Sequence, residues 1–224
     1  MTFGKDYWDQ HWQRTGGAPT AMERNPPNPY LVDATSTLTP GTALDAGCGA
    51  GAEAILLASQ GWQVTAADIS RDALDKAIRS ATAASLSQQV SWLEADLTTW
   101  TPTTQYDLVT THYAHPTIPQ LAFYNRISNW VAPGGTLLLV GHLHTPNTPH
   151  SEPEHSHAGH GHGEHGHGSR EHRPPAEASV GLADIVAGLD NGRWEIVAAG
   201  EHTRTLAGRA SDLRDVVVQA TRRL

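Results

Sequence analysis

Apolar and polar positions follow two periods along this chain. Short apolar runs predict buried strands, and longer segments in which apolar residues recur at helical spacing predict helices. Strands that alternate with helices indicate a parallel sheet with right-handed crossovers. The expected strands are 42–46, 62–68, 90–96, 106–113 and 136–142, and the expected helices between them are 52–61, 70–86 and 119–135.

The C-terminal part of the chain predicts one more helix and two more strands. The helix is expected at 178–189, and the strands at 193–205 and 214–223 are joined by a loop that contains Gly208. We expect these two strands to form an antiparallel pair at the edge of the sheet. The pattern has no internal repeat, so residues 1–224 are expected to form a single α/β domain with seven strands.

One segment interrupts this pattern. Residues 143–175 are rich in Gly, His, Glu and Pro, and residues 150–172 hold eight of the fourteen histidines of the chain. A segment with so few apolar residues cannot bury enough surface to order itself. We therefore expect an inserted loop between the fifth strand and the next helix.

The composition argues against several function classes. A net charge of −8 without a basic cluster argues against a nucleic-acid partner. The longest apolar runs are far shorter than a membrane span. Cys48 is the only cysteine, which excludes an intrachain disulfide and a cysteine-based zinc site. The N-terminus lacks the apolar stretch of a signal peptide, and we expect a cytoplasmic protein.

A glycine-rich turn carries the strongest chemical signal. The first expected strand ends at Asp45 and Ala46, and the chain then passes through Gly47, Gly49 and Gly51 into a helix. Glycines let the backbone turn tightly and approach a ligand, and the helix start offers free N–H groups. In open α/β sheets, ligands bind beyond the carboxyl ends of the strands.

Acidic residues around this turn distinguish two classes of cofactor. Gly47, Gly49 and Ala52 satisfy the loose dinucleotide pattern G-x-G-x-x-A, which is weak by itself. Asp45 is positioned to meet an ammonium group, whereas an acid has no favourable role beside a pyrophosphate. Asp68 ends the second strand, where its carboxylate can accept hydrogen bonds from ribose hydroxyls. Together these acids favour a ligand that carries an amino-acid tail.

The motifs resemble those of class I S-adenosylmethionine-dependent methyltransferases, in the same order along the chain. The similar segments are "DAGCGAG" (45–51), "EADL" (94–97), "YDLVTTHYAH" (106–115) and "VAPGGTLLLVGH" (131–142), within a match over residues 28–142. The resemblance implies a Rossmann-like fold with a mostly parallel seven-stranded sheet and an antiparallel C-terminal hairpin. It implies S-adenosylmethionine as cofactor, bound by Asp45, Gly47, Cys48, Gly49, Gly51, Asp68, Ile69, Asp96, Leu97 and Thr111.

Three further segments narrow the resemblance. "YWDQHW" (7–12), "NPPNPYL" (25–31) and "HYAHP" (112–116) are similar to small bacterial enzymes of the tellurite-resistance and thiopurine S-methyltransferase groups. The acceptors of those enzymes are small, soft nucleophiles. Residues 1–30 are expected to form an N-terminal helical lid. Trp8 and Trp12 share one helical face, and they serve either to dock this helix or to contact substrate.

The residues after the fourth strand are the candidates for the acceptor site. His112, Tyr113 and His115 lie where the acceptor is expected, and the alternative is that they only pack against the lid. Methyl transfer needs a base only if the acceptor must lose a proton, and His112 or His115 is then the natural candidate. Asn28 is expected either to cap the next helix or to contact the cofactor tail.

The histidine run suggests a second, accessory chemistry. Imidazoles suit Zn²⁺, Ni²⁺, Cu²⁺ or Co²⁺, and the glycines between them favour several weak sites over one preformed site. The alternative is a solvated loop without metal. A metal-buffering protein and a nicotinamide oxidoreductase are the competing functions, and Asp45 and the terminal hairpin argue against the second. The candidate metal ligands are His155, His157, His160, His162, His165 and His167.

Overall fold

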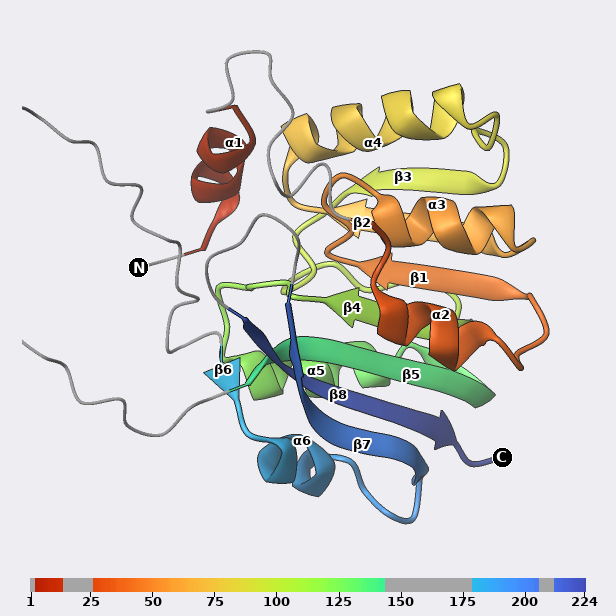
Figure 1. The fold of residues 1–224 in the computed structure, drawn as a ribbon, viewed down its shortest axis with the longest axis vertical. Helices are drawn as coiled ribbons and strands as arrows, with labels where there is room; N and C mark the ends of the chain where they lie inside the picture. The colour runs from red at the N-terminus through yellow and green to blue at the C-terminus, as the bar shows by residue number, and fades with distance from the viewer. Residues whose placement is uncertain (1–2, 14–25, 144–178, 206–211) are drawn as a thin grey trace, which may run out of the picture.

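The computed structural model describes residues 3–13, 26–143, 179–205 and 212–224. Their centre is one sheet with the strand order β3-β2-β1-β4-β5-β8-β7, and a short β6 pairs with β5 (Figure 1). The first five strands are parallel, and β8 runs antiparallel to both β5 and β7. The strands are β1 (Thr42–Ala46), β2 (Gln63–Asp68), β3 (Val90–Glu94), β4 (Tyr106–His112), β5 (Val131–Leu143), β6 (Ser179–Val180), β7 (Trp194–Arg204) and β8 (Leu213–Arg222).

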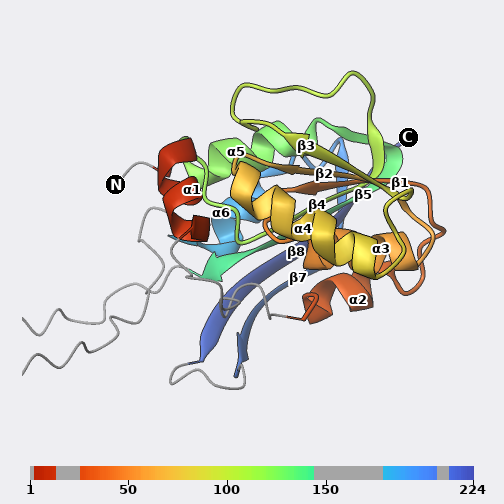
Figure 2. The ribbon, with the colours of Figure 1, turned by 90° about the horizontal axis from the view of Figure 1, so that it is seen from above.

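Helices cover both faces of this sheet, and each face has its own apolar core. Helices α2, α3 and α4 lie together on one side in Figure 2, and α5 and α6 pack on the other. Successive residues of β5 serve opposite cores, because Leu138 joins the first and Leu139 the second. The helices are α1 (Lys5–Gln13), α2 (Pro29–Thr35), α3 (Ala52–Ser59), α4 (Arg71–Ala83), α5 (Gln120–Ser128) and α6 (Leu182–Gly188).

The expected mostly parallel α/β sheet with its antiparallel C-terminal pair is confirmed, but two element boundaries differ from the sequence-based expectation. Helix α5 ends at Ser128 instead of continuing to residue 135, and β5 begins at Val131. The cause is pairing across the sheet, since the Tyr106 N–H donates to the Trp130 carbonyl and Tyr106 aligns with Val131.

A second difference lies at the start of the expected helix 178–189. Ser179 and Val180 form β6, whose partners are His142 and Leu143 at the end of β5, so α6 begins only at Leu182. The sheet among the described residues therefore contains one short strand more than the seven that were expected.

Helix α1 docks on the start of α4, beyond the carboxyl ends of β1 and β2 (Figure 1). Trp12 is buried, its carbonyl accepts a hydrogen bond from Lys76 Nζ, and its ring packs against Gly49. Ser70 caps α4 by accepting from the Ala73 N–H, and its hydroxyl donates to Asp9 of α1 at 2.7 Å. One buried serine thus joins the cap of α4 to the docking of α1.

We predict that Ser70→Ala lowers the free energy of unfolding by about 1 kcal/mol, the usual cost of losing an N-cap. Urea unfolding followed by circular dichroism measures the change. Ser80→Ala is the matched control, because Ser80 lies in the same helix and is exposed, and its effect should stay within about 0.5 kcal/mol. Equal stability of Ser70→Ala and the wild type would contradict the assigned cap.

Candidate active site

The glycine-rich turn has the backbone that its sequence predicts. Gly47, Gly49 and Gly51 have φ angles of 82°, 51° and 81°, in the left-handed region that glycine tolerates best. Space is also short, because a Cβ on Gly51 would lie 2.7 Å from Trp92 and one on Gly47 would lie 2.5 Å from Ala114. Glycine is required here by torsion and by packing.

Three acids surround this turn. Asp45 is buried at the end of β1, and its Oδ2 has no hydrogen-bond partner. Asp68 accepts from the Gly49 N–H at 2.8 Å and from the Ser70 N–H at 2.9 Å, so it ties the turn to the start of α4. Glu53, in the first turn of α3, accepts from the Asn28 N–H at 3.1 Å.

Burial disfavours the charge of all three carboxylates, and the other two also repel the charge of Asp45. Burial raises the pKa of Asp45 well above its ordinary value, and the charges of Glu53 and Asp68 raise it further. Burial also raises the pKa of Glu53 and the pKa of Asp68. A cationic group beside Asp45 would relieve this repulsion and satisfy the unpartnered oxygen. The residues present therefore fit the ammonium group of an amino-acid tail.

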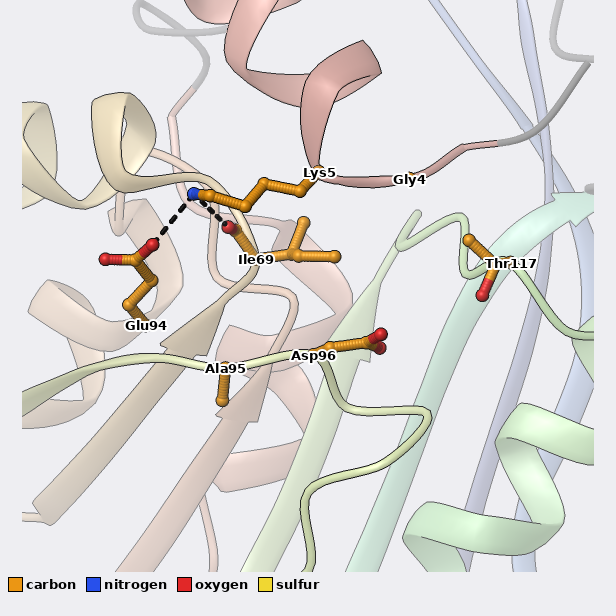
Figure 3. Close-up of a pocket in the computed structure, with 7 residues that line it drawn as sticks. All are labelled: Gly4, Lys5, Ile69, Glu94, Ala95, Asp96 and Thr117. Atoms are coloured by element: carbon orange, nitrogen blue, oxygen red, sulfur yellow. Dashed lines mark hydrogen bonds and ion pairs between the residues drawn. The ribbon is translucent and has the colours of Figure 1, made fainter.

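A cavity of about 410 Å³ opens at the carboxyl ends of β2 and β3, lined in part by Ile69, Glu94 and Asp96. Lys5 of α1 spans its mouth and donates to the Ile69 carbonyl at 3.3 Å and to Glu94 at 2.7 Å (Figure 3). Asp96 lines the cavity and points towards the side on which Thr117 lies. The cavity therefore contains two of the predicted cofactor residues, Ile69 and Asp96.

The other predicted cofactor residues lie close to this cavity or behind it. The Asp96 carboxylate also accepts from the N–H and hydroxyl of Thr98, so it caps a turn while it faces the cavity. Leu97 is buried, and Thr111 is buried with its hydroxyl bonded to the Ala46 carbonyl. Cys48 is buried within the glycine turn, as a small packed residue is expected to be.

One of the predicted acceptor residues, His115, meets helix α1. The His115 ring stacks on Trp8 of α1 with centroids 6.0 Å apart, and on His142 of β5 at 5.4 Å. The Tyr113 ring lies 4.7 Å from His142 on the far side of that stack. We call these four rings the acceptor wall, after the acceptor that the sequence predicts beside His115 and Tyr113; its members are Trp8, His115, His142 and Tyr113.

The histidines beside this wall are uncharged at neutral pH. Burial, assisted by the charge of Arg204, lowers the pKa of His112 to about 3. Burial, assisted by His142, lowers the pKa of His115 to about 4. His112 Nε2 pairs with the Thr110 hydroxyl at 2.8 Å, and the Nδ1 atoms of His112 and His115 are buried without a partner.

Several residues at this edge carried no clear signal in the sequence. Glu53 could have been found as an acid in the first turn after the glycines, whereas Lys5, His142, Arg204 and Asp215 lie in ordinary-looking helix or strand segments. The structure shows one of the two expected roles of Asn28, the helix cap. Its side chain caps α2 through the Tyr30 N–H, and its own N–H binds Glu53.

The predicted metal ligands His155, His157, His160, His162, His165 and His167 lie outside the described residues. Among the residues whose positions are described, no group of three or more His, Cys, Asp or Glu side chains could hold a metal ion. Within the same part of the chain, every helix is too short or too polar to cross a membrane.

Comparison with known proteins finds a family match for the central part of the chain. Residues 43–135 match the family described as "Methyltransferase domain". The chain is 29% identical over 137 residues to "Probable thiol methyltransferase 2" of Arabidopsis thaliana, which covers 58% of this chain and 59% of that protein. It is 33% identical over 102 residues to "Thiocyanate methyltransferase 1" of the same plant, covering 46% and 44%. The chain thus spans about half the length of these relatives.

Solved structures share the fold at low sequence identity. TehB from Haemophilus influenzae aligns with a TM-score of 0.65 and 16% identity, over 98% of this chain and 67% of TehB. Magnesium protoporphyrin IX methyltransferase from Synechocystis PCC 6803, with bound S-adenosylhomocysteine, aligns with a TM-score of 0.64 and 17% identity, over 97% of both chains. The central part of the chain thus matches a methyltransferase domain, and the described residues share the fold of a solved methyltransferase, in agreement with the resemblance to class I S-adenosylmethionine-dependent methyltransferases that the motifs indicate.

Proposed function

We propose that this protein transfers a methyl group from S-adenosylmethionine to a small, soft nucleophile such as a thiol or thiocyanate. One observation carries the cofactor assignment, namely the buried Asp45 with an unpartnered oxygen at the left-handed glycine turn. The names of the thiol and thiocyanate methyltransferases that the chain resembles support the acceptor class.

Each part of the site has a role in this proposal. Asp45 and Glu53 receive the ammonium group of the amino-acid tail, and the N–H groups of the turn face its carboxylate. Asp68 and Ile69 hold the ribose, while Asp96 and the Leu97 N–H hold the adenine. The bound cofactor supplies a methyl group activated on a sulfonium. The chain binds and orients the reactants and excludes water, which are the main sources of rate for an in-line displacement.

The acceptor is proposed to bind at the acceptor wall and His112, beneath the lid. An imidazole whose pKa is about 3 or 4 is a weak base, so these histidines suit an acceptor that needs no deprotonation. Thiolates and thiocyanate meet this condition. The uncharged His112 and His115 place no cation at these two positions to oppose the positive sulfonium. Residues 1–30 belong to the same single domain in this proposal, with α1 as the described part of the lid.

The histidine run stays a prediction from the sequence. We keep it as an accessory loop at residues 143–175 that binds Zn²⁺, Ni²⁺, Cu²⁺ or Co²⁺ weakly, outside the methyl-transfer site. The competing metal-buffering function has no support from the described residues.

We predict that Asp68→Ala weakens the binding of S-adenosylhomocysteine by about 1.5–3 kcal/mol, the range for hydrogen bonds to a charged group. Isothermal titration calorimetry measures the dissociation constant. Asp75→Ala is the control, because Asp75 is exposed on the outer face of α4 and pairs only with Arg71 in the described bonds. An unchanged dissociation constant in Asp68→Ala would remove the ribose assignment.

The affinity for S-adenosylhomocysteine should fall as the pH is lowered, beginning at a higher pH than for ordinary carboxyl groups, because the three raised carboxyl pKa values lead to early protonation. The ligand-free protein should gain stability over the same range, since acids with raised pKa values destabilise the fold while they are ionised. Asp45→Asn should flatten both dependences. Calorimetry and urea unfolding at several pH values test this, and a pH-independent affinity would count against the carboxylate cluster.

A panel of acceptors with methyl-labelled S-adenosylmethionine tests the acceptor class. We expect transfer to thiocyanate, hydrosulfide and thiophenol, and none to catechol or a primary amine. His115→Ala should raise the KM for the acceptor at least tenfold while leaving S-adenosylhomocysteine affinity within about twofold, because the ring lies on the wall and not in the cofactor cavity. Transfer to catechol in preference to thiols would refute the soft-nucleophile assignment.

A further inference from the structure

A partly buried cluster of polar side chains includes Tyr113 of the acceptor wall, and we call Tyr30, Tyr113, Arg204 and Asp215 the hub. Asp215 is fully buried and accepts hydrogen bonds from Arg204 Nε at 2.6 Å, from the Tyr113 hydroxyl at 2.8 Å and from the Tyr30 hydroxyl at 3.2 Å. These residues come from α2, the end of β4, β7 and β8. The hub therefore joins segments that are far apart in the sequence.

Hydrogen bonds occupy every position of the Tyr113 hydroxyl. That hydroxyl donates to Asp215, and it accepts from Arg204 Nη2 at 2.7 Å and from Asn28 Nδ2 at 3.5 Å. A phenol has one proton and two lone pairs, so all three positions are occupied. Burial and the Asp215 charge also raise the pKa of Tyr113, which keeps the phenol protonated. The acceptor can meet only the ring of Tyr113.

The backbone of Tyr113 makes an unusual turn at this point. Its φ angle is 54°, a left-handed value that bulky residues seldom adopt and that persists only when surrounding contacts hold it. The turn places Ala114 against Gly47, so that a Cβ added to Gly47 would lie 2.5 Å from the Ala114 Cβ. It also brings His115 into its stack with Trp8. One strained residue therefore sets the acceptor wall relative to the cofactor turn.

Stability does not explain why the hub contains the ion pair between Arg204 and Asp215. A buried ion pair loses solvation that its attraction seldom exceeds, and apolar residues of the same volume often serve stability equally well. What a guanidinium and a carboxylate supply is directional bonding, because Arg204 uses two nitrogens of its planar group on two partners. Two of these bonds end on Tyr113, which with Ser85 is one of two non-glycine residues in the described part of the chain that have a left-handed backbone.

We propose that Asp215 and Arg204 are positioning residues that hold the turn at Tyr113 and so align the acceptor wall with the methyl group of the bound cofactor. The inference rests on the proposed methyl transfer at this site. Neither residue needs to touch the acceptor, because both act through the Tyr113 hydroxyl. Misalignment of the reactants by about 1 Å can lower the rate by about a hundredfold, so a small movement of this turn is sufficient.

The test uses the full chain with Tyr113→Phe, Asp215→Asn and Arg204→Lys. Glu195→Gln is the matched control, because it makes the same type of change in the exposed Glu195–Arg223 pair of the same hairpin. The measurements are kcat and KM with thiocyanate and thiophenol, S-adenosylhomocysteine affinity by calorimetry, and crystal structures with that ligand. Tyr113→Phe removes one oxygen only, which keeps the test decisive if Asp215→Asn fails to fold.

The expected result is a fall of at least tenfold in kcat for Tyr113→Phe and Asp215→Asn, with S-adenosylhomocysteine affinity within about threefold of the wild type, and a smaller fall for Arg204→Lys. Residue 113 should move in the crystal structures of the variants. Wild-type kcat in both variants, or an unmoved residue 113, overturns the proposal. Loss of S-adenosylhomocysteine binding by the wild type would instead refute the proposed function, and if neither probe is methylated, the position of residue 113 decides.

Discussion

The close approach of two loops at the carboxyl edge of the sheet governs the rest of this site. The turn after β1 has no room for a side chain at Gly47 because Ala114, just after β4, occupies that space. The same contact brings the acidic cofactor side and the aromatic acceptor side together. Methyl transfer requires two reactants in line and in contact. The packing of the Ala114 side chain against Gly47 therefore sets how the proposed cofactor and acceptor sites face each other.

Charge divides this edge into two halves. The proposed cofactor side gathers Asp45, Glu53 and Asp68, whose burial makes their charges costly, and Glu53 and Asp68 also repel the charge of Asp45. On the proposed acceptor side, His112 and His115 are uncharged at neutral pH, and Arg204 is paired with Asp215. We propose that this arrangement favours a cationic cofactor on the first side and a polarizable acceptor on the second.

In the described part of the chain, three of the four buried side-chain atoms without a hydrogen-bond partner lie in these two halves, and the fourth, Gln89 Oε1, lies in the turn before β3. Asp45 Oδ2, His112 Nδ1 and His115 Nδ1 have no hydrogen-bond partner among the described residues, whereas most buried polar groups in folded proteins are paired. The hub beside them has no such unpartnered buried atom. The structure thus combines a hydrogen-bonded cluster with three unsatisfied atoms at the places where ligands are proposed to bind.

The sequence by itself determined the order and type of most elements and the cofactor turn. Helical and strand periods are local properties of the sequence. The glycines at positions 47, 49 and 51 by themselves predict a turn with a left-handed backbone. Only the tertiary structure decided that residues 131–135 join β5, because their partner at Tyr106 lies across the sheet. It alone also brought Arg204 and Asp215 to Tyr113 and buried His112 enough to keep it neutral, since pKa values and hydrogen bonds depend on neighbours distant in the chain.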